Sequence, residues 1–163
     1  MAQDFFTYQV GMKFYLNGSL SPFLSKGKDM LEEVADRYKD SMLGARAATV
    51  LANAVGRPFF RIENNVITKT HKPDPQAALA LTKPVLDMYQ EKKSPALNLD
   101  YRQLVCQRAE CMKASGEHDE AIGELTTLIS DLKACGVNQP VLDEIEKYER
   151  SISTGGRKKR SAP

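Results

Sequence analysis

The sequence contains no tryptophan, and only three cysteines and two histidines among its 163 residues. An odd number of cysteines argues against a disulfide framework, so we expect reduced thiols. No stretch approaches the roughly 18 to 20 consecutive apolar residues that a membrane-spanning helix needs. A glycine-rich phosphate loop and a His-Glu-x-x-His helix are also absent from the sequence. We therefore expect no membrane span, no cofactor and no bound metal.

Hydrophobic residues make up 42% of the chain, which is enough for the core of a single domain of this size. The sequence predicts one domain over residues 1–152 and a disordered basic tail over residues 153–163. Four consecutive basic residues at 157–160 outweigh the formal net charge of +2, which leaves residues 1–156 at −2. A body so close to neutral does not indicate a nucleic-acid groove.

The chain opens on Met1-Ala2-Gln3-Asp4, which lacks the basic and apolar regions of a signal peptide. We therefore expect a soluble, cytoplasmic protein. An excised domain or a cleaved precursor would have lost its targeting signal, so a removed signal stays open as an alternative.

Apolar residues recur at helical spacing along most of the chain, and the pattern predicts an all-α fold of about seven helices. Capping residues at Ser41 and Asp74, and glycines at Gly116 and Gly136, mark several of the boundaries. The predicted helices span about residues 4–17, 22–38, 42–55, 75–92, 100–115, 120–135 and 139–152, with Glu117-His118-Asp119 leading into the sixth.

An insertion near residues 57–72 does not follow the helical pattern. Residues 59–62 and 66–68 have the composition of two short extended arms around Glu63-Asn64-Asn65. The sequence predicts a small hairpin or an ordered loop here.

The segment from Asp100 to Leu132 has the form helix, short turn, helix, with Ala109 and Ala121 as small residues in the two helices. These alanines would let the helices touch while larger residues fill the seam: Leu104, Val105, Met112, Leu125 and Leu128. The unit resembles a tetratricopeptide repeat, and weaker matches extend the resemblance over residues 4–135. No tryptophan marks the start of a unit, so we describe the chain as a tetratricopeptide-like (TPR-like) array of antiparallel helix pairs.

Cys106, Cys111, Cys135 and His118 invite a zinc interpretation, but Cys106 and Cys111 lie five apart on a predicted helix. Their side chains would diverge by roughly 140° around the axis, which does not suit a shared metal ion. His118 falls in a predicted turn, where we expect a solvent-exposed residue. The sequence assigns no catalytic residue and no metal ligand, and we expect a protein that is not an enzyme.

The TPR-like resemblance implies a concave surface, lined by the first helix of each unit, that binds a peptide or a partner helix. The alternative for the three residues of the first helix is that they pack under a neighbouring helix. The residues that we expect to face outward are Tyr8, Met12 and Tyr15; Arg46, Thr49 and Asn53; and Gln103, Cys106, Glu110 and Lys113.

The sequence therefore favours a non-catalytic protein–protein interaction module or scaffold whose partner is a protein or peptide. A structural helical domain of a larger protein, including a secreted or envelope protein, is one alternative. Exposure of Val141, Leu142, Ile145 and Tyr148 would favour it. Nucleic-acid binding assisted by the basic C-terminal tail is a second alternative.

Overall fold

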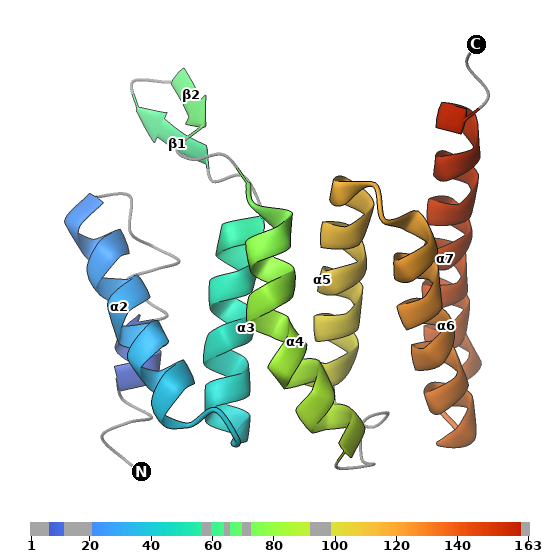
Figure 1. Ribbon diagram of the computed structural model, residues 1–163, viewed down its shortest axis with the longest axis horizontal. Helices are drawn as coiled ribbons and strands as arrows, with labels where there is room; N and C mark the ends of the chain where they lie inside the picture. Colours follow the sequence, from blue (N-terminus) through green and yellow to red (C-terminus); the bar gives the residue numbers. More distant parts are fainter. Residues whose placement is uncertain are drawn as a thin grey trace. The chain divides into compact units, whose positions relative to one another are not determined.

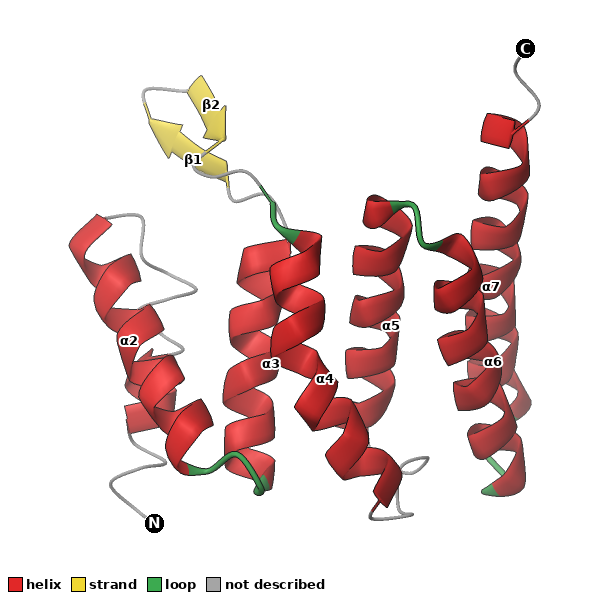
Figure 2. Ribbon diagram, in the orientation of Figure 1, coloured by secondary structure: helices red, strands yellow, loops and turns green. Residues whose placement is uncertain are grey.

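The computed structural model is an all-α protein with one small β-hairpin (Figures 1 and 2). It describes residues 7–11, 21–56, 60–63, 66–69, 73–91 and 99–160; for residues 21–25, 60–63, 66–69, 99 and 155–160 it describes the backbone alone. Seven helical segments lie within these residues, which confirms the predicted fold class. The TPR-like arrangement of the helices stays a prediction.

A short helical segment, residues 7–11, precedes six longer helices, and the hairpin lies between the second and third of these. The longer elements are α2 (Ser21–Arg37), α3 (Met42–Gly56), β1 (Phe60–Glu63), β2 (Val66–Lys69), α4 (Pro75–Glu91), α5 (Leu99–Ser115), α6 (His118–Ala134) and α7 (Gln139–Arg160).

The chain groups into two compact units, Met1–Val85 and Leu86–Pro163. Their boundary falls inside α4, one residue after Pro84, and the helix runs through this proline without interruption. One helix therefore contributes to both units. The predicted single domain over residues 1–152 stays a prediction.

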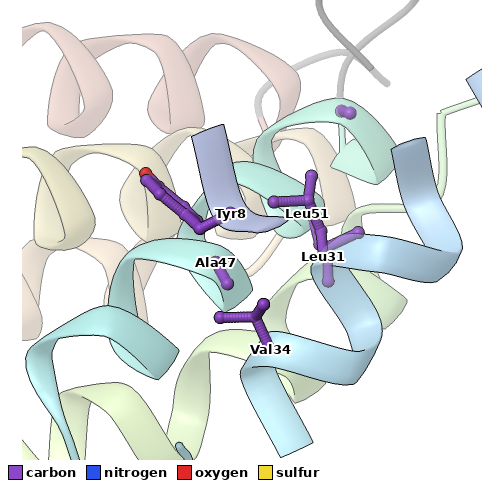
Figure 3. Close-up of a cluster of buried hydrophobic side chains, with 6 residues drawn as sticks. Tyr8, Leu31, Val34, Ala47 and Leu51 are labelled. Carbon is purple, nitrogen blue, oxygen red and sulfur yellow. The ribbon is translucent and has the colours of Figure 1, made fainter. Parts of the chain in front are cut away.

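The core of the first unit is built where residues 7–11, α2 and α3 meet. Leu31 and Val34 of α2 are buried against Ala47 and Leu51 of α3, and Tyr8 closes the cluster from the short helical segment (Figure 3). Seven residues of α3 are buried, and five of these are alanine, whose small side chains let neighbouring segments approach the helix closely. A helix buried on so many sides is a central one.

Local capping explains where α3 and α4 begin. Ser41 Oγ accepts a hydrogen bond from the backbone N–H of Gly44 at 3.3 Å. Asp74 Oδ1 accepts one from the N–H of Ala77 at 2.9 Å, and Pro75 then opens α4. Side-chain oxygens satisfy amide groups that a first helical turn leaves unpaired, as the sequence predicted at both places.

The insertion forms an antiparallel hairpin, which confirms the first of its two predicted forms. Phe60 pairs with Lys69 and Glu63 with Val66, so each strand lies one residue from the range expected for it. The predicted turn residues Asn64 and Asn65 lie outside the described residues.

In the second unit, α5, α6 and α7 lie side by side, with α6 packed against both of the others (Figure 1). Gly116 has φ +87° and Gly136 has φ +67°, a region that favours glycine. After each glycine an amide turns back to the ending helix: Glu117 N–H donates to Met112 O at 2.8 Å, and Val137 N–H donates to Leu132 O at 3.1 Å. These two left-handed turns reverse the chain within a few residues.

The seam between α5 and α6 contains the residues that the sequence assigned to it. Ala109 and Ala121 are fully buried, and the larger seam residues are at most 7% exposed: Leu104, Val105, Met112, Leu125 and Leu128. The small residues allow close approach and the large ones fill the space beside them.

The last helix is longer than predicted. The sequence placed its end at Ile152 and a disordered tail over residues 153–163, but α7 continues to Arg160. Gly155 and Gly156, which cost about 1 kcal/mol each relative to alanine, do not end the helix. Basic residues that follow are good helix formers and are favoured near a helix C-terminus by the helix dipole. Residues 161–163 lie outside the described part.

Among the described residues, none of the helices combines the length and the apolar character that crossing a bilayer requires.

Candidate functional site

The predicted outward-facing residues fall into two groups, one in each unit. Arg46, Thr49 and Asn53 lie on α3, and Gln103, Cys106, Glu110 and Lys113 lie on α5. Met12 and Tyr15 lie outside the described residues.

Tyr8 corrects the prediction for the first helix. Its side chain is only 6% exposed and packs in the cluster with Leu31, Val34 and Ala47 (Figure 3). The alternative, packing under a neighbouring helix, is therefore right for this residue. A tyrosine on a short helix has a large apolar body, and burying that body is more favourable than exposing it.

The α3 group is only partly accessible. Arg46 is exposed, whereas Thr49 and Asn53 are half-buried. Thr49 Oγ1 donates a hydrogen bond to the Ala45 carbonyl at 2.8 Å, one turn back in the same helix. Asn53 Oδ1 is buried and has no hydrogen-bond partner among the described residues. Of this group, only Arg46 is therefore exposed.

The α5 group forms one continuous face, which we call the α5 stripe: Gln103, Cys106, Glu110 and Lys113. Gln103, Glu110 and Lys113 are exposed, and Cys106 is half-buried. Glu110 and Lys113 form an ion pair of 3.9 Å, and Lys113 Nζ lies 5.9 Å from the centre of the Tyr148 ring on α7. On the opposite face of α5, Tyr101 and Leu104 are fully buried. One face of α5 is therefore buried, while the opposite face presents amide, carboxylate and ammonium groups to solvent.

Sequence analysis did not find the polar pair inside the second unit. Arg108 Nε donates to Glu124 Oε2 at 2.9 Å, and its Nη2 donates to Oε1 at 2.7 Å. The Arg108 side chain is 6% exposed and that of Glu124 20%. The sequence does contain a signal for this pair, namely an arginine on the apolar face of α5. A buried arginine needs a carboxylate partner, so its position could have indicated one.

Beside this pair, Tyr101 contacts two neighbouring helices. Its ring lies 5.5 Å from that of Tyr89 on α4, and its hydroxyl lies 3.5 Å from Asp131 Oδ2 on α6. Burial, followed by the negative charge of Asp131 and the hydrogen bond to it, raises the pKa of Tyr101 to about 12. The neutral phenol is therefore the form that the fold favours.

We expect alkaline pH to destabilise the second unit through Tyr101. The unfolded tyrosine ionises near pH 10 and the folded one near pH 12, so its contribution is complete below the first value and is lost as pH rises to the second. Urea titrations over this range, with the ultraviolet absorbance of tyrosinate recorded in parallel, measure the loss. Tyr101→Phe should flatten the dependence; an equally steep loss in that variant would assign it to other groups.

All three cysteines are free thiols, and of the two histidines only His118 lies within the described residues. Burial, followed by the charge of Glu110 and opposed by Arg102, raises the pKa of the Cys106 thiol, which lowers its thiolate fraction. His118 is half-buried with Nδ1 buried, which corrects the expected solvent-exposed position. No group of three or more potential metal ligands occurs in the described part of the chain.

No family model, curated protein or solved structure matches this chain. The resemblance to tetratricopeptide repeats therefore rests on the residues alone. It stays a prediction.

Proposed function

We propose that this chain is a non-catalytic protein–protein interaction module that binds a peptide or a partner helix along the α5 stripe. The observation that carries the proposal is the division of α5 into a fully buried face and an exposed polar face. Leu104 and Ala109 are fully buried, whereas Gln103 and Glu110 are exposed. In the TPR-like architecture that the sequence resembles, α5 is the first helix of a unit, the helix that lines the binding surface.

The chemistry of the α5 stripe suits an exchangeable contact. An exposed ion pair such as Glu110 with Lys113 contributes about 0 to 1 kcal/mol, so a partner can replace it at small cost. Gln103 adds an amide that both donates and accepts hydrogen bonds. These groups recognise polar and charged side chains of a partner while the buried face of α5 holds the helix in place.

The test exchanges the two charges of the α5 stripe. Glu110→Lys/Lys113→Glu keeps the net charge, the composition and an opposite-charge pair, so stability should hardly change. We expect a bound partner, identified by quantitative mass spectrometry and then purified, to bind this variant at least about tenfold more weakly, which corresponds to about 1.4 kcal/mol.

The matched control exchanges another exposed pair. Lys28 and Glu32 lie 3.2 Å apart on α2 and are about equally exposed. Lys28→Glu/Glu32→Lys should bind the partner as the unmodified chain does. Equal affinity of both exchange variants would contradict the proposal, and so would the absence of any protein that depends on Glu110 and Lys113.

An exposed apolar face on α7 would favour the structural-domain alternative. Leu142 and Ile145 are instead 4% and 8% exposed, and Val141 and Tyr148 are half-buried. The observation that would favour this alternative is not met at its two central residues.

The nucleic-acid alternative gains one observation, the continuation of α7 to Arg160. A helical backbone spaces the four basic residues at 157–160 about 1.5 Å apart along its axis, which raises the charge density of this segment relative to an extended chain. In the same capture experiment, a variant lacking residues 155–163 separates the two functions. Binding of nucleic acid that disappears at moderate salt and in the truncated variant would favour the alternative. Binding of the partner that depends on the α5 stripe should persist in both cases.

A further inference from the structure

A small hollow in the second unit is not part of the α5 stripe. Tyr101, which lines it, lies roughly 160° around α5 from Gln103. The hollow has a volume of about 180 Å³ and opens between the end of α4 and the helices α5 and α6. Its lining residues are Leu86, Gln90, Tyr101, Val105, Glu120, Gly123, Glu124 and Thr127.

The hollow has an apolar wall beside polar groups, among them Gln90, Thr127 and two carboxylates. Leu86, Tyr101 and Val105 are at most 4% exposed and provide the apolar wall. Glu120 is exposed at the mouth, one helical turn before Glu124. A group that enters the hollow therefore contacts apolar side chains along one wall and carboxylates near the opening.

The charges around the hollow are unequal. Glu120 and Glu124 line it, and Asp131 accepts the hydrogen bond of its tyrosine. Arg108 pairs with Glu124 from within the protein. In this set of described residues three carboxylates face one guanidinium, which leaves an excess of negative charge. The same field contributes to the raised pKa of Tyr101, to which Asp131 and Glu124 both add.

The size of the hollow limits which chemical groups can occupy it. Pockets for drug-sized ligands and cofactors measure about 300 to 1,000 Å³, well above this volume. A space of about 180 Å³ holds one long side chain. Lysine and arginine combine an aliphatic stem with a terminal cation, and they bury the stem on apolar surface while the cation stays among polar groups.

We propose that this hollow is a socket for a basic side chain, lysine or arginine, of a protein partner. The aliphatic stem packs on Leu86, Val105 and the ring of Tyr101. The cation lies at the mouth, against the carboxylate of Glu120 and the acceptor site of Glu124 that the three hydrogen bonds from Arg108 leave. The socket is a second recognition site, and it does not depend on binding at the α5 stripe.

The test uses the full chain, labelled with ¹⁵N, and a five-residue probe peptide with blocked ends and a central lysine. We expect saturable shifts of the amide signals of Tyr101, Gly123 and Thr127, with a dissociation constant on the order of 1 mM. A peptide with norleucine in place of lysine keeps the stem without the charge, and it should bind at least about tenfold more weakly. A glutamate peptide should not bind.

Two variants test the socket itself. Glu120→Gln removes the charge at the mouth and should weaken the lysine peptide about fivefold or more. Gly123→Met should block the hollow without disturbing the fold, because a Cβ at Gly123 meets no heavy atom within 4 Å. Glu144→Gln, which removes an exposed charge of α7 away from the hollow, is the control and should bind normally.

Several results would overturn the socket. These are equal affinity for the lysine and norleucine peptides, binding unaffected by Gly123→Met, or shifts confined to other residues. The full chain could also self-associate, lose this association when residues 155–163 are removed, and bind the lysine peptide only after that removal. These results together would instead assign the hollow to the basic tail of a second copy. The peptide probes need no natural partner, so a negative result with them does not bear on the proposal for the α5 stripe. Likewise, a negative result with the Glu110/Lys113 exchange does not bear on the proposal for the socket.

Discussion

Gly44→Ala should lower the free energy of unfolding of the first unit by about 3 kcal/mol, although alanine is the better helix former. A Cβ placed on Gly44 would overlap the carbonyl carbon and oxygen of Tyr38 and lie 3.0 Å from the backbone N of Lys39. Backbone atoms cannot rotate away as the end of a side chain can. The turn between α2 and α3 would have to move.

That turn is held by the hydrogen bonds that begin α3. The Tyr38 carbonyl accepts from the Ser41 N–H at 2.9 Å and from the Ser41 hydroxyl at 2.8 Å. The same hydroxyl oxygen accepts from the Gly44 N–H. Moving the carbonyl therefore also strains the cap, whose loss alone costs about 1 kcal/mol. The expected total joins this loss to an overpacking cost of typically 1 to 3 kcal/mol.

Gly123→Ala is the matched control, since it makes the same change in a helix with open space around the glycine. It should stabilise the protein by about 0.5 to 1 kcal/mol, the ordinary gain in helix propensity. Urea denaturation followed by circular dichroism measures both variants. A Gly44→Ala protein as stable as the unmodified chain would show that the close approach to Tyr38 does not exist in solution.

The helix boundaries could be predicted because their signals are local. Ser41 and Asp74 cap with their own side chains, and Gly116 and Gly136 adopt a positive φ that few other residues accept. Each signal acts within about four residues of the boundary, so it can be read without knowing the packing.

The orientation of side chains on short segments could not be predicted in the same way. Tyr8 faces the core because α2 and α3 lie over that side of its segment, which the sequence of residues 7–11 does not contain. The three-residue group on α3 and the four-residue group on α5 show the same limit. Helical spacing placed each group on one face, but only packing decides that Asn53 is half-buried while Glu110 is exposed.

The pair Arg108–Glu124 could be predicted only in part. An arginine among Leu104, Val105 and Met112 indicates a buried charge, but its partner lies 16 residues away on another helix. Several carboxylates of α6 lie within similar reach along the sequence. The turn at Gly116 sets the register between α5 and α6, and this register selects Glu124.

Removing one member of this pair should be the most destabilising change in the second unit. Arg108→Met leaves the Glu124 carboxylate desolvated without its guanidinium, and we expect a loss of about 3 to 5 kcal/mol of unfolding free energy. Glu124→Gln should cost a similar amount, since it strands the arginine, whose side chain is 6% exposed. Urea denaturation of both variants measures the losses.

The double variant Arg108→Met/Glu124→Leu separates the cost of an unpaired charge from the value of the pair. The desolvation cost of a buried ion pair largely offsets the attraction between its charges. Replacing both members by apolar residues of similar volume should therefore leave stability within about 1 to 2 kcal/mol of the unmodified chain. The two single losses would then not add, and the coupling energy should exceed about 2 kcal/mol.

The exposed pair Lys28–Glu32 provides the comparison for Arg108–Glu124. Lys28→Met should change stability by less than about 0.5 kcal/mol, because both of its side chains are about half exposed and water already screens them. Salt should likewise have little effect on the buried pair. If Arg108→Met cost as little as Lys28→Met, Arg108 would be solvated in solution, and the bidentate contact with Glu124 would not hold α5 to α6.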